Sequence, residues 1–156
     1  MALVTMDVRT YTQSAFPTDE RLVVRFVPSG ASLGTAYSFP LREVKVQVPS
    51  DGKVSVQLAP TVRLVPSTWY EIRFEWFDKH PLKDDWELRG WSDLPGRLHV
   101  PFEGGDVTDL LGDFTATPIL IWMGFGPPPS WLPSGGVYYD LASDSGVDIY
   151  SEGQVV

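Results

Sequence analysis

The fold is decided by the stretch Trp69-Tyr70-Glu71-Ile72-Arg73-Phe74-Glu75-Trp76-Phe77. Apolar and charged side chains alternate along it with a period of two, which predicts a β-strand with Tyr70, Ile72, Phe74 and Trp76 on one face. The opposite face carries the charged residues. A sheet with one apolar face needs a second layer to cover it, so the stretch predicts two packed sheets.

Shorter runs of the same kind lie on the N-terminal side of this strand. Residues 22–27 form a β-branched run that the turn residues 28–30 close. Residues 44–48 and 54–58 alternate valine or leucine with polar side chains on either side of a Pro-Ser-Asp-Gly turn, which predicts a β-hairpin. Strands at such short spacing, with turn residues between them, predict an all-β fold, specifically an immunoglobulin-like or fibronectin-like β-sandwich.

The second half of the chain has a different pattern of residues. Residues 118–123 are apolar throughout, as in a strand that is buried on both faces or lies in an interface. Residues 126–133 contain four prolines and are expected to be extended. Two short runs on either side of Ser143-Asp144-Ser145-Gly146 predict a C-terminal β-hairpin. We therefore expect a β-sandwich domain over residues 1–90, a connector with short strands over 91–125, and a Pro-rich segment with the hairpin over 126–156.

Composition excludes several classes of function. The 156 residues carry a formal net charge of −8, which disfavours nucleic-acid partners and anionic membranes. The chain has no cysteine, and therefore no disulfide, thiolate zinc site or cysteine nucleophile. No apolar run reaches the 18 residues that a membrane-spanning helix needs. The sequence predicts a protein that is made and folded in a cytoplasm.

No catalytic motif is present. The two histidines, His80 and His99, lie outside any nucleophile-elbow context, so a Ser-His-Asp triad is not indicated. The acidic loop at residues 78–85 does not match the spacing of a calcium-binding loop and is better explained as a solvated turn. The Gly-Gly pairs at 104–105 and 135–136 lack the strand-then-helix context of a phosphate-binding loop. We expect a non-enzymatic protein without a cofactor or a metal.

The aromatic residues of the second half allow two interpretations. They could form a stacking platform for a sugar, with Trp86, Trp91 and Trp131 as the candidates. They could instead fill the core and the subunit contacts, where aromatic side chains are enriched. The second interpretation is favoured, because nothing orders these residues along one strand face. The candidate interface residues are Ile119, Ile121, Trp122, Met123, Pro127, Pro128, Trp131, Tyr138, Tyr139 and Tyr150.

Three parts of the chain carry a resemblance to a known family. They are residues 51–60 followed by 70–74, residues 91–101 followed by 106–111, and the run Gly126-Pro127-Pro128-Pro129-Ser130-Trp131-Leu132-Pro133 before Val137-Tyr138-Tyr139-Asp140-Leu141. In this arrangement the chain resembles minor tail proteins of long-tailed, siphovirus-type bacteriophages, especially those of actinobacterial hosts.

The resemblance implies a structural protein of the virion tail, at the tail tip or the fibre base. It implies an immunoglobulin-like or fibronectin-like sandwich that assembles with other tail proteins, and a homotrimer is the favoured oligomer. Family members are frequently longer and bind the host after the hairpin; because this chain stops at Val156, an adaptor or attachment role is expected. The alternative, from a different class, is a carbohydrate-binding module that recognises a glycan of the host cell envelope.

Overall fold

The computed structural model describes residues 1–12, 20–35, 37–111, 121–132, 136–144, 148–151 and 154–155. Its elements are β1 (Ala2–Asp7), α1 (Arg9–Thr12), β2 (Glu20–Pro28), β3 (Ser32–Leu33), β4 (Ser38–Phe39), β5 (Val44–Gln47), β6 (Lys53–Leu58), β7 (Tyr70–Lys79), β8 (Trp86–Leu98), β9 (Gly105–Asp106), α2 (Val107–Leu110), β10 (Ile121–Gly124), β11 (Val137–Asp140), β12 (Asp148–Ser151) and β13 (Gln154–Val155). The two helices have four residues each, so the prediction of an all-β fold is confirmed.

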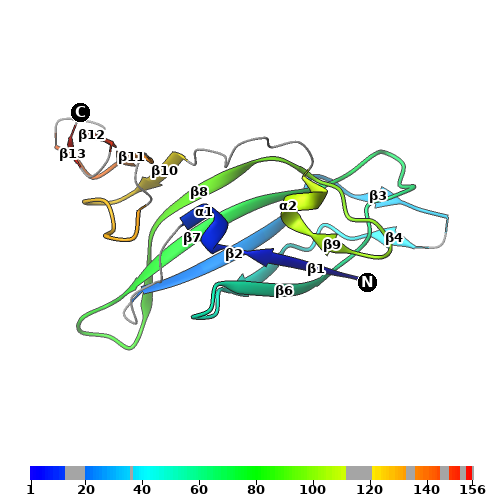
Figure 1. The fold of residues 1–156 in the computed structure, drawn as a ribbon, viewed down its shortest axis with the longest axis horizontal. Helices are drawn as coiled ribbons and strands as arrows, with labels where there is room; N and C mark the ends of the chain where they lie inside the picture. The colour runs from blue at the N-terminus through cyan, green and yellow to red at the C-terminus, as the bar shows by residue number, and fades with distance from the viewer. Residues whose placement is uncertain are drawn as a thin grey trace.

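The strands are divided between one large sheet and one small one (Figure 1). The large sheet has eight strands in the order β13-β12-β11-β10-β8-β7-β2-β5, and the small sheet has the order β6-β1-β9. The strands β3 and β4 form a separate two-stranded ribbon. Buried side chains from both main sheets belong to a single hydrophobic core, so the two sheets act as the layers that the alternating pattern requires.

The long strand β7 lies at the centre of the large sheet. It pairs antiparallel with β2 from Glu20↔Asp78 to Pro28↔Tyr70, and antiparallel with β8 on its other side. Tyr70, Ile72, Phe74 and Trp76 are all buried, as their spacing predicts. They belong to the same hydrophobic core as Leu22, Val24 and Phe26 of β2 and, from the small sheet, Val4, Met6 and Val54.

The hairpin predicted for residues 44–58 is wrong in its pairing. Both strands exist, but β5 pairs with β2 in the large sheet, whereas β6 pairs with β1 in the small sheet. The chain passes from one layer to the other through the turn that contains Gly52, which has a φ of 75°. The valines of β6 still face the core, as the alternation requires, but they approach it from the opposite layer.

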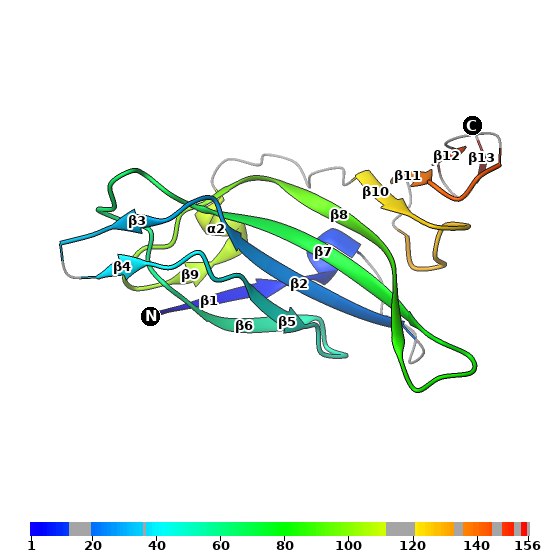
Figure 2. The same cartoon turned by 180° about the vertical axis from the view of Figure 1, so that it is seen from behind.

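The boundary predicted at residue 90 falls within a strand of the large sheet. Residue 90 lies inside β8, and β10 pairs antiparallel with β8 through Met123↔Trp91. The strand β11 then pairs parallel with β10, and β12 pairs antiparallel with β11. The C-terminal strands therefore continue the large sheet and, as Figure 2 shows, form one end of the molecule. We call strands β10 to β13 the C-terminal extension.

A cluster of aromatic rings joins the C-terminal extension to the core. The ring centroid of Trp122 lies 5.6 Å from that of Trp76 and 5.0 Å from that of Trp131. Tyr138 lies 6.0 Å from Trp76, and Trp122 lies 6.1 Å from Phe74. Centroids 5–6 Å apart, with most rings tilted or edge to face, are the favourable arrangement for aromatic pairs. The extension is thus packed on the rest of the chain through its own buried side chains.

Tyr70 links the two layers at the start of β7. Its phenol oxygen accepts a hydrogen bond from the Ala59 backbone N–H (3.2 Å) and lies 3.3 Å from the Ala59 carbonyl, to which it donates. Ala59 follows directly after β6. Burial raises the pKa of the Tyr70 hydroxyl to about 12. Among the described residues, no helix is long and apolar enough to cross a membrane.

Candidate interaction face

The large sheet has one face turned to the core and one turned away from it, which we call the outer face. Because side chains alternate along a strand, the outer face of β7 carries Arg73, Glu75 and Phe77 between the buried residues. The register of the sheet places Arg25 of β2 opposite Arg73, and Asp93 of β8 opposite Arg73 on the other side. The outer face therefore combines charged residues from several strands that are distant in the sequence.

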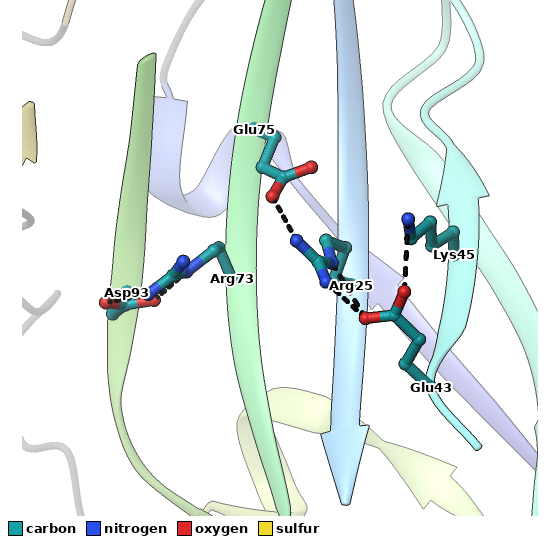
Figure 3. A network of polar contacts seen from close by, with 6 residues as sticks. All are labelled: Arg25, Glu43, Lys45, Arg73, Glu75 and Asp93. Carbon is teal, nitrogen blue, oxygen red and sulfur yellow. Dashed lines mark hydrogen bonds and ion pairs between the residues drawn. The ribbon is translucent and has the colours of Figure 1, made fainter. Parts of the chain in front are cut away.

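Arg25 is the centre of an ion-pair network on this face (Figure 3). Its guanidinium donates to Glu75, and it also donates to Glu43 through both Nε and Nη2. Lys45 approaches the other oxygen of Glu43 at 3.1 Å. The hydrogen bonds to Glu43 and Glu75 raise the pKa of Arg25, and the hydrogen bond from Arg25 lowers the pKa of Glu43. Glu75 is 7% exposed, so its charge depends on Arg25 for compensation.

A second ion pair lies beside this network. Arg73 contacts Asp93 with two parallel hydrogen bonds, from Nε to Oδ1 at 2.6 Å and from Nη2 to Oδ2 at 3.0 Å. This two-point contact raises the pKa of Arg73 and fixes the orientation of both side chains. Ion pairs thus orient the arginines on the charged half of the outer face.

The other half of the outer face is aromatic and apolar. Trp91 stands opposite Glu75 on β7 and opposite Met123 on β10, and Met123 stands opposite Tyr139 on β11. The ring of Phe125 lies 6.1 Å from that of Trp91. Trp91, Met123 and Tyr139 are partly exposed, and Phe125 is exposed. A row of large apolar side chains therefore begins at the ion pairs and continues onto the C-terminal extension.

A cleft opens at the other end of β7 and β8, where the pairing of the two strands is irregular between Tyr70 and Ile72. It has a volume of about 380 Å³ and is lined by Trp69, Glu71, Asp93 and Arg97, among others. The guanidinium carbon of Arg97 lies 4.1 Å from the centroid of the Trp69 ring. Sequence reasoning did not single out Trp69 or Arg97, because their contact depends on a bulge that the alternating pattern does not reveal.

The candidate interface residues fall into three groups. Ile121, Met123, Pro127, Pro128 and Tyr139 are exposed or partly exposed. Trp122, Trp131 and Tyr138 are at most 3% exposed and belong to the chain's own core, so they are not open to a partner. Ile119 lies outside the described residues, and for Tyr150 the structure describes only the backbone, in β12. The apolar spacing of residues 118–123 could not distinguish an interface strand from a core strand.

The three tryptophans of the carbohydrate alternative do not form one platform. Trp131 is buried, with its indole N–H donating to Glu20. Trp86 is partly exposed, but the guanidinium carbon of Arg21 lies 3.8 Å from the centroid of its ring. Trp91 is the candidate that remains partly exposed with no cation of the described residues over its ring. A single such side chain is a weak basis for sugar stacking.

Within the described ranges, no group of three or more His, Asp or Glu side chains could hold a metal ion. Both carboxylates nearest the aromatic row, Glu75 and Asp93, are engaged by arginines. In comparisons with known proteins, no family model, no curated protein and no solved structure matches the chain.

Proposed function

We propose that this protein is a non-enzymatic structural component of a bacteriophage tail, at the tail tip or the fibre base, that acts through protein–protein contacts. The proposal places it in the virion, among other tail proteins. The sequence resemblance suggests the setting, and the outer face supports the mode of action. The fold proposed with it is an immunoglobulin-like sandwich with an added C-terminal extension.

Two features support the immunoglobulin-like assignment. The order β5-β2-β7-β8 in the large sheet and the neighbours β6-β1 in the small sheet correspond to strands C′-C-F-G and E-B of such a sandwich. Tyr70 stands where strand F begins and bonds to the backbone at Ala59, just after strand E, in the manner of a tyrosine corner. The pairing of β9 with β1 differs from that scheme, because it is parallel.

The observation that carries the assembly role is the row of partly exposed apolar side chains beside ion pairs that are already formed. Aromatic residues, Met and Arg are enriched in protein interfaces. Arg25 and Arg73 are already oriented by their carboxylate partners, so little side-chain entropy remains to be lost on association. Such a face suits contact with another folded protein better than it suits chemistry.

The proposal is tested on particles of the phage that encodes the chain. An antibody raised against the purified protein, detected with gold by negative-stain electron microscopy, is expected to label one end of the tail. An antibody against the capsid protein serves as the control. Gold that is absent from intact tails, together with absence of the chain from the peptides of purified particles, would reject the role. Neighbouring genes for a tape measure protein would support it independently.

The carbohydrate alternative is favoured by one observation, the partly exposed Trp91 beside Phe125. It predicts that polysaccharide from the host envelope quenches or shifts tryptophan fluorescence, and that Trp91→Ala abolishes the response. A fluorescence spectrum that host polysaccharide leaves unchanged would remove this alternative.

A further inference from the structure

The charges of this chain are divided unevenly along the sequence. All twelve Lys and Arg residues, and twelve of the twenty Asp and Glu residues, lie within residues 1–97. The first 97 residues are therefore formally neutral. Residues 98–156 hold the other eight carboxylates and no Lys or Arg, so they account for the entire net charge of −8. An acidic region without internal cations attracts a cation from elsewhere.

Arg97 is the last Lys or Arg in the sequence, and the carboxylates of Glu71 and Asp93 line the same cleft, where Asp93 is already bound by Arg73. In the described part of the chain it forms no ion pair or hydrogen bond, and its contact is the face of the Trp69 ring. Stacking uses the face of a guanidinium and leaves its N–H edge free to bind a carboxylate at two points. Trp69 therefore holds Arg97 in a cleft with its donors available. Trp and Arg are also the residue types that dominate the energy of interfaces.

The acidic region offers a matching group on the C-terminal extension. The turn after β11 carries Asp144, which is exposed and forms no ion pair with the described residues. Asp140 is a poor candidate, because it is 7% exposed and its Oδ1 already accepts hydrogen bonds from the N–H groups of Gly126 and Ala142. Among the described side chains of the extension, Asp144 is thus the carboxylate that another molecule can reach.

The two groups lie at opposite ends of the molecule. The extension forms one end, and the end of β8 that carries Arg97 points toward β3 and β4 at the other (Figures 1 and 2). Arg97 and Asp144 of the same chain therefore cannot contact each other. A second copy can make the contact, because its Asp144 turn can enter the Trp69–Arg97 cleft of the first.

We propose that copies of this protein associate head to tail, with Arg97 of one copy, stacked on Trp69, binding Asp144 in the C-terminal extension of the next. Such a heterologous contact forms a ring if the rotation between copies closes and a filament if it does not. The inference rests on the proposed assembly function and deepens it by naming a partner, which is the chain itself.

Sedimentation equilibrium of the full-length chain tests the contact. The wild type is expected to self-associate. This association should weaken as NaCl rises from about 50 mM to about 500 mM, because exposed charges are screened. Arg97→Glu and Asp144→Lys, each alone, should raise the dissociation constant by about tenfold or more. The double variant R97E/D144K restores opposite charges across the contact and should return the constant to within about threefold of wild type.

Lys83→Glu is the matched control, since it makes the same change of charge at an exposed site on the 80–85 loop and should leave association unchanged. Arg97→Lys keeps the charge but loses the planar fork, and an intermediate constant is expected. A wild type that stays monomeric, an R97E variant that behaves like K83E, or a double variant that is not rescued would each overturn the inference. Gold labelling of the tail would still support the proposed function in those cases, so the two failures are distinguishable.

Discussion

Gly90 of β8 lies directly opposite Trp76 of β7, so closely that a Cβ atom on Gly90 would overlap the indole ring. The same Cβ would also overlap the carbonyl oxygen of Met123 on β10. Gly90 therefore lets the central strand, the aromatic cluster and the C-terminal extension meet at one point. The absence of a side chain there is a packing requirement.

Gly90→Ala is expected to lower the free energy of unfolding by about 2 kcal/mol or more, because backbone and a buried ring must both move. Gly30→Ala is the matched control, since nothing lies within 4 Å of the added atom. Urea unfolding followed by tryptophan fluorescence measures both variants. Equal midpoints for the two would contradict this account of Gly90.

Removing the hydroxyl of Tyr70 tests the link between the layers. Tyr70→Phe keeps the ring in the core but removes both hydrogen bonds to Ala59. We expect a loss of about 1 kcal/mol in unfolding free energy, since one neutral hydrogen-bonded group is lost and the backbone N–H is left without its acceptor. Tyr139→Phe, on the partly exposed outer face, should change stability little. The reverse ranking in denaturant titrations would reject the link.

The free energy of unfolding should fall at alkaline pH, because the Tyr70 hydroxyl ionises less readily in the folded chain. The pKa of Tyr70 is about 12 in the folded chain, against an ordinary value of 10.0, because burial disfavours the phenolate. A pKa raised on folding gives stability that is fully present below pH 10.0 and is lost as the pH rises toward 12. The urea midpoint of the wild type should therefore decline over this window. The decline should be shallower in Tyr70→Phe, and parallel curves would contradict the assignment.

Arg25 should contribute more to stability than Arg73. Arg25→Gln leaves Glu75, which is 7% exposed, without its compensating charge, and we expect a cost of about 2 kcal/mol. Arg73→Gln removes a pair whose side chains are 40% and 55% exposed, and should cost about 0.5 kcal/mol. Thermal unfolding at neutral pH compares them. Equal losses would mean that burial of Glu75 does not control the network.

Substitution of Trp131 tests whether this residue belongs to the core or to an interface. Its side chain is 3% exposed and packs on Trp76 and Trp122, so Trp131→Ala should cost about 3 kcal/mol or more. Trp86→Ala, at a partly exposed ring, should cost less than about 1 kcal/mol. Calorimetry of the two variants gives the comparison. A Trp131→Ala protein with wild-type stability would return this residue to the list of possible partner contacts.

The alternation of residues 69–77 was sufficient to predict the central strand and its buried face, because a period of two has one structural meaning. The pairing of the strands was harder to predict from the sequence than the strands themselves. Residues 44–58 have an ideal local hairpin pattern, yet β5 pairs with β2 in the large sheet and β6 pairs with β1 in the small sheet. Local signals identify strands, and distant segments decide which of them pair.

Part of the candidate site could be predicted from the sequence. The candidate interface residues predicted in the second half include Met123 and Tyr139, which are partly exposed, but composition could not separate them from the buried Trp122 and Tyr138, which lie one position away on the opposite face. The Trp69–Arg97 cleft was missed altogether. It brings together the residue before β7 and a residue within the irregular segment of β8, a geometry that no spacing rule encodes.

The strand β1 also sets a condition on synthesis of the protein. It pairs with β6, about fifty residues later, and with β9, where the Thr5 hydroxyl bonds to Asp106 across a separation of 101 residues. At a ribosomal rate of about 5–20 residues per second, β1 waits roughly 5–20 s for its last neighbour. During that interval its apolar face and one backbone edge are open to other nascent chains. A lower level of expression reduces the concentration of nascent chains and should therefore raise the yield of native protein. A chaperone that shields β1 should have the same effect.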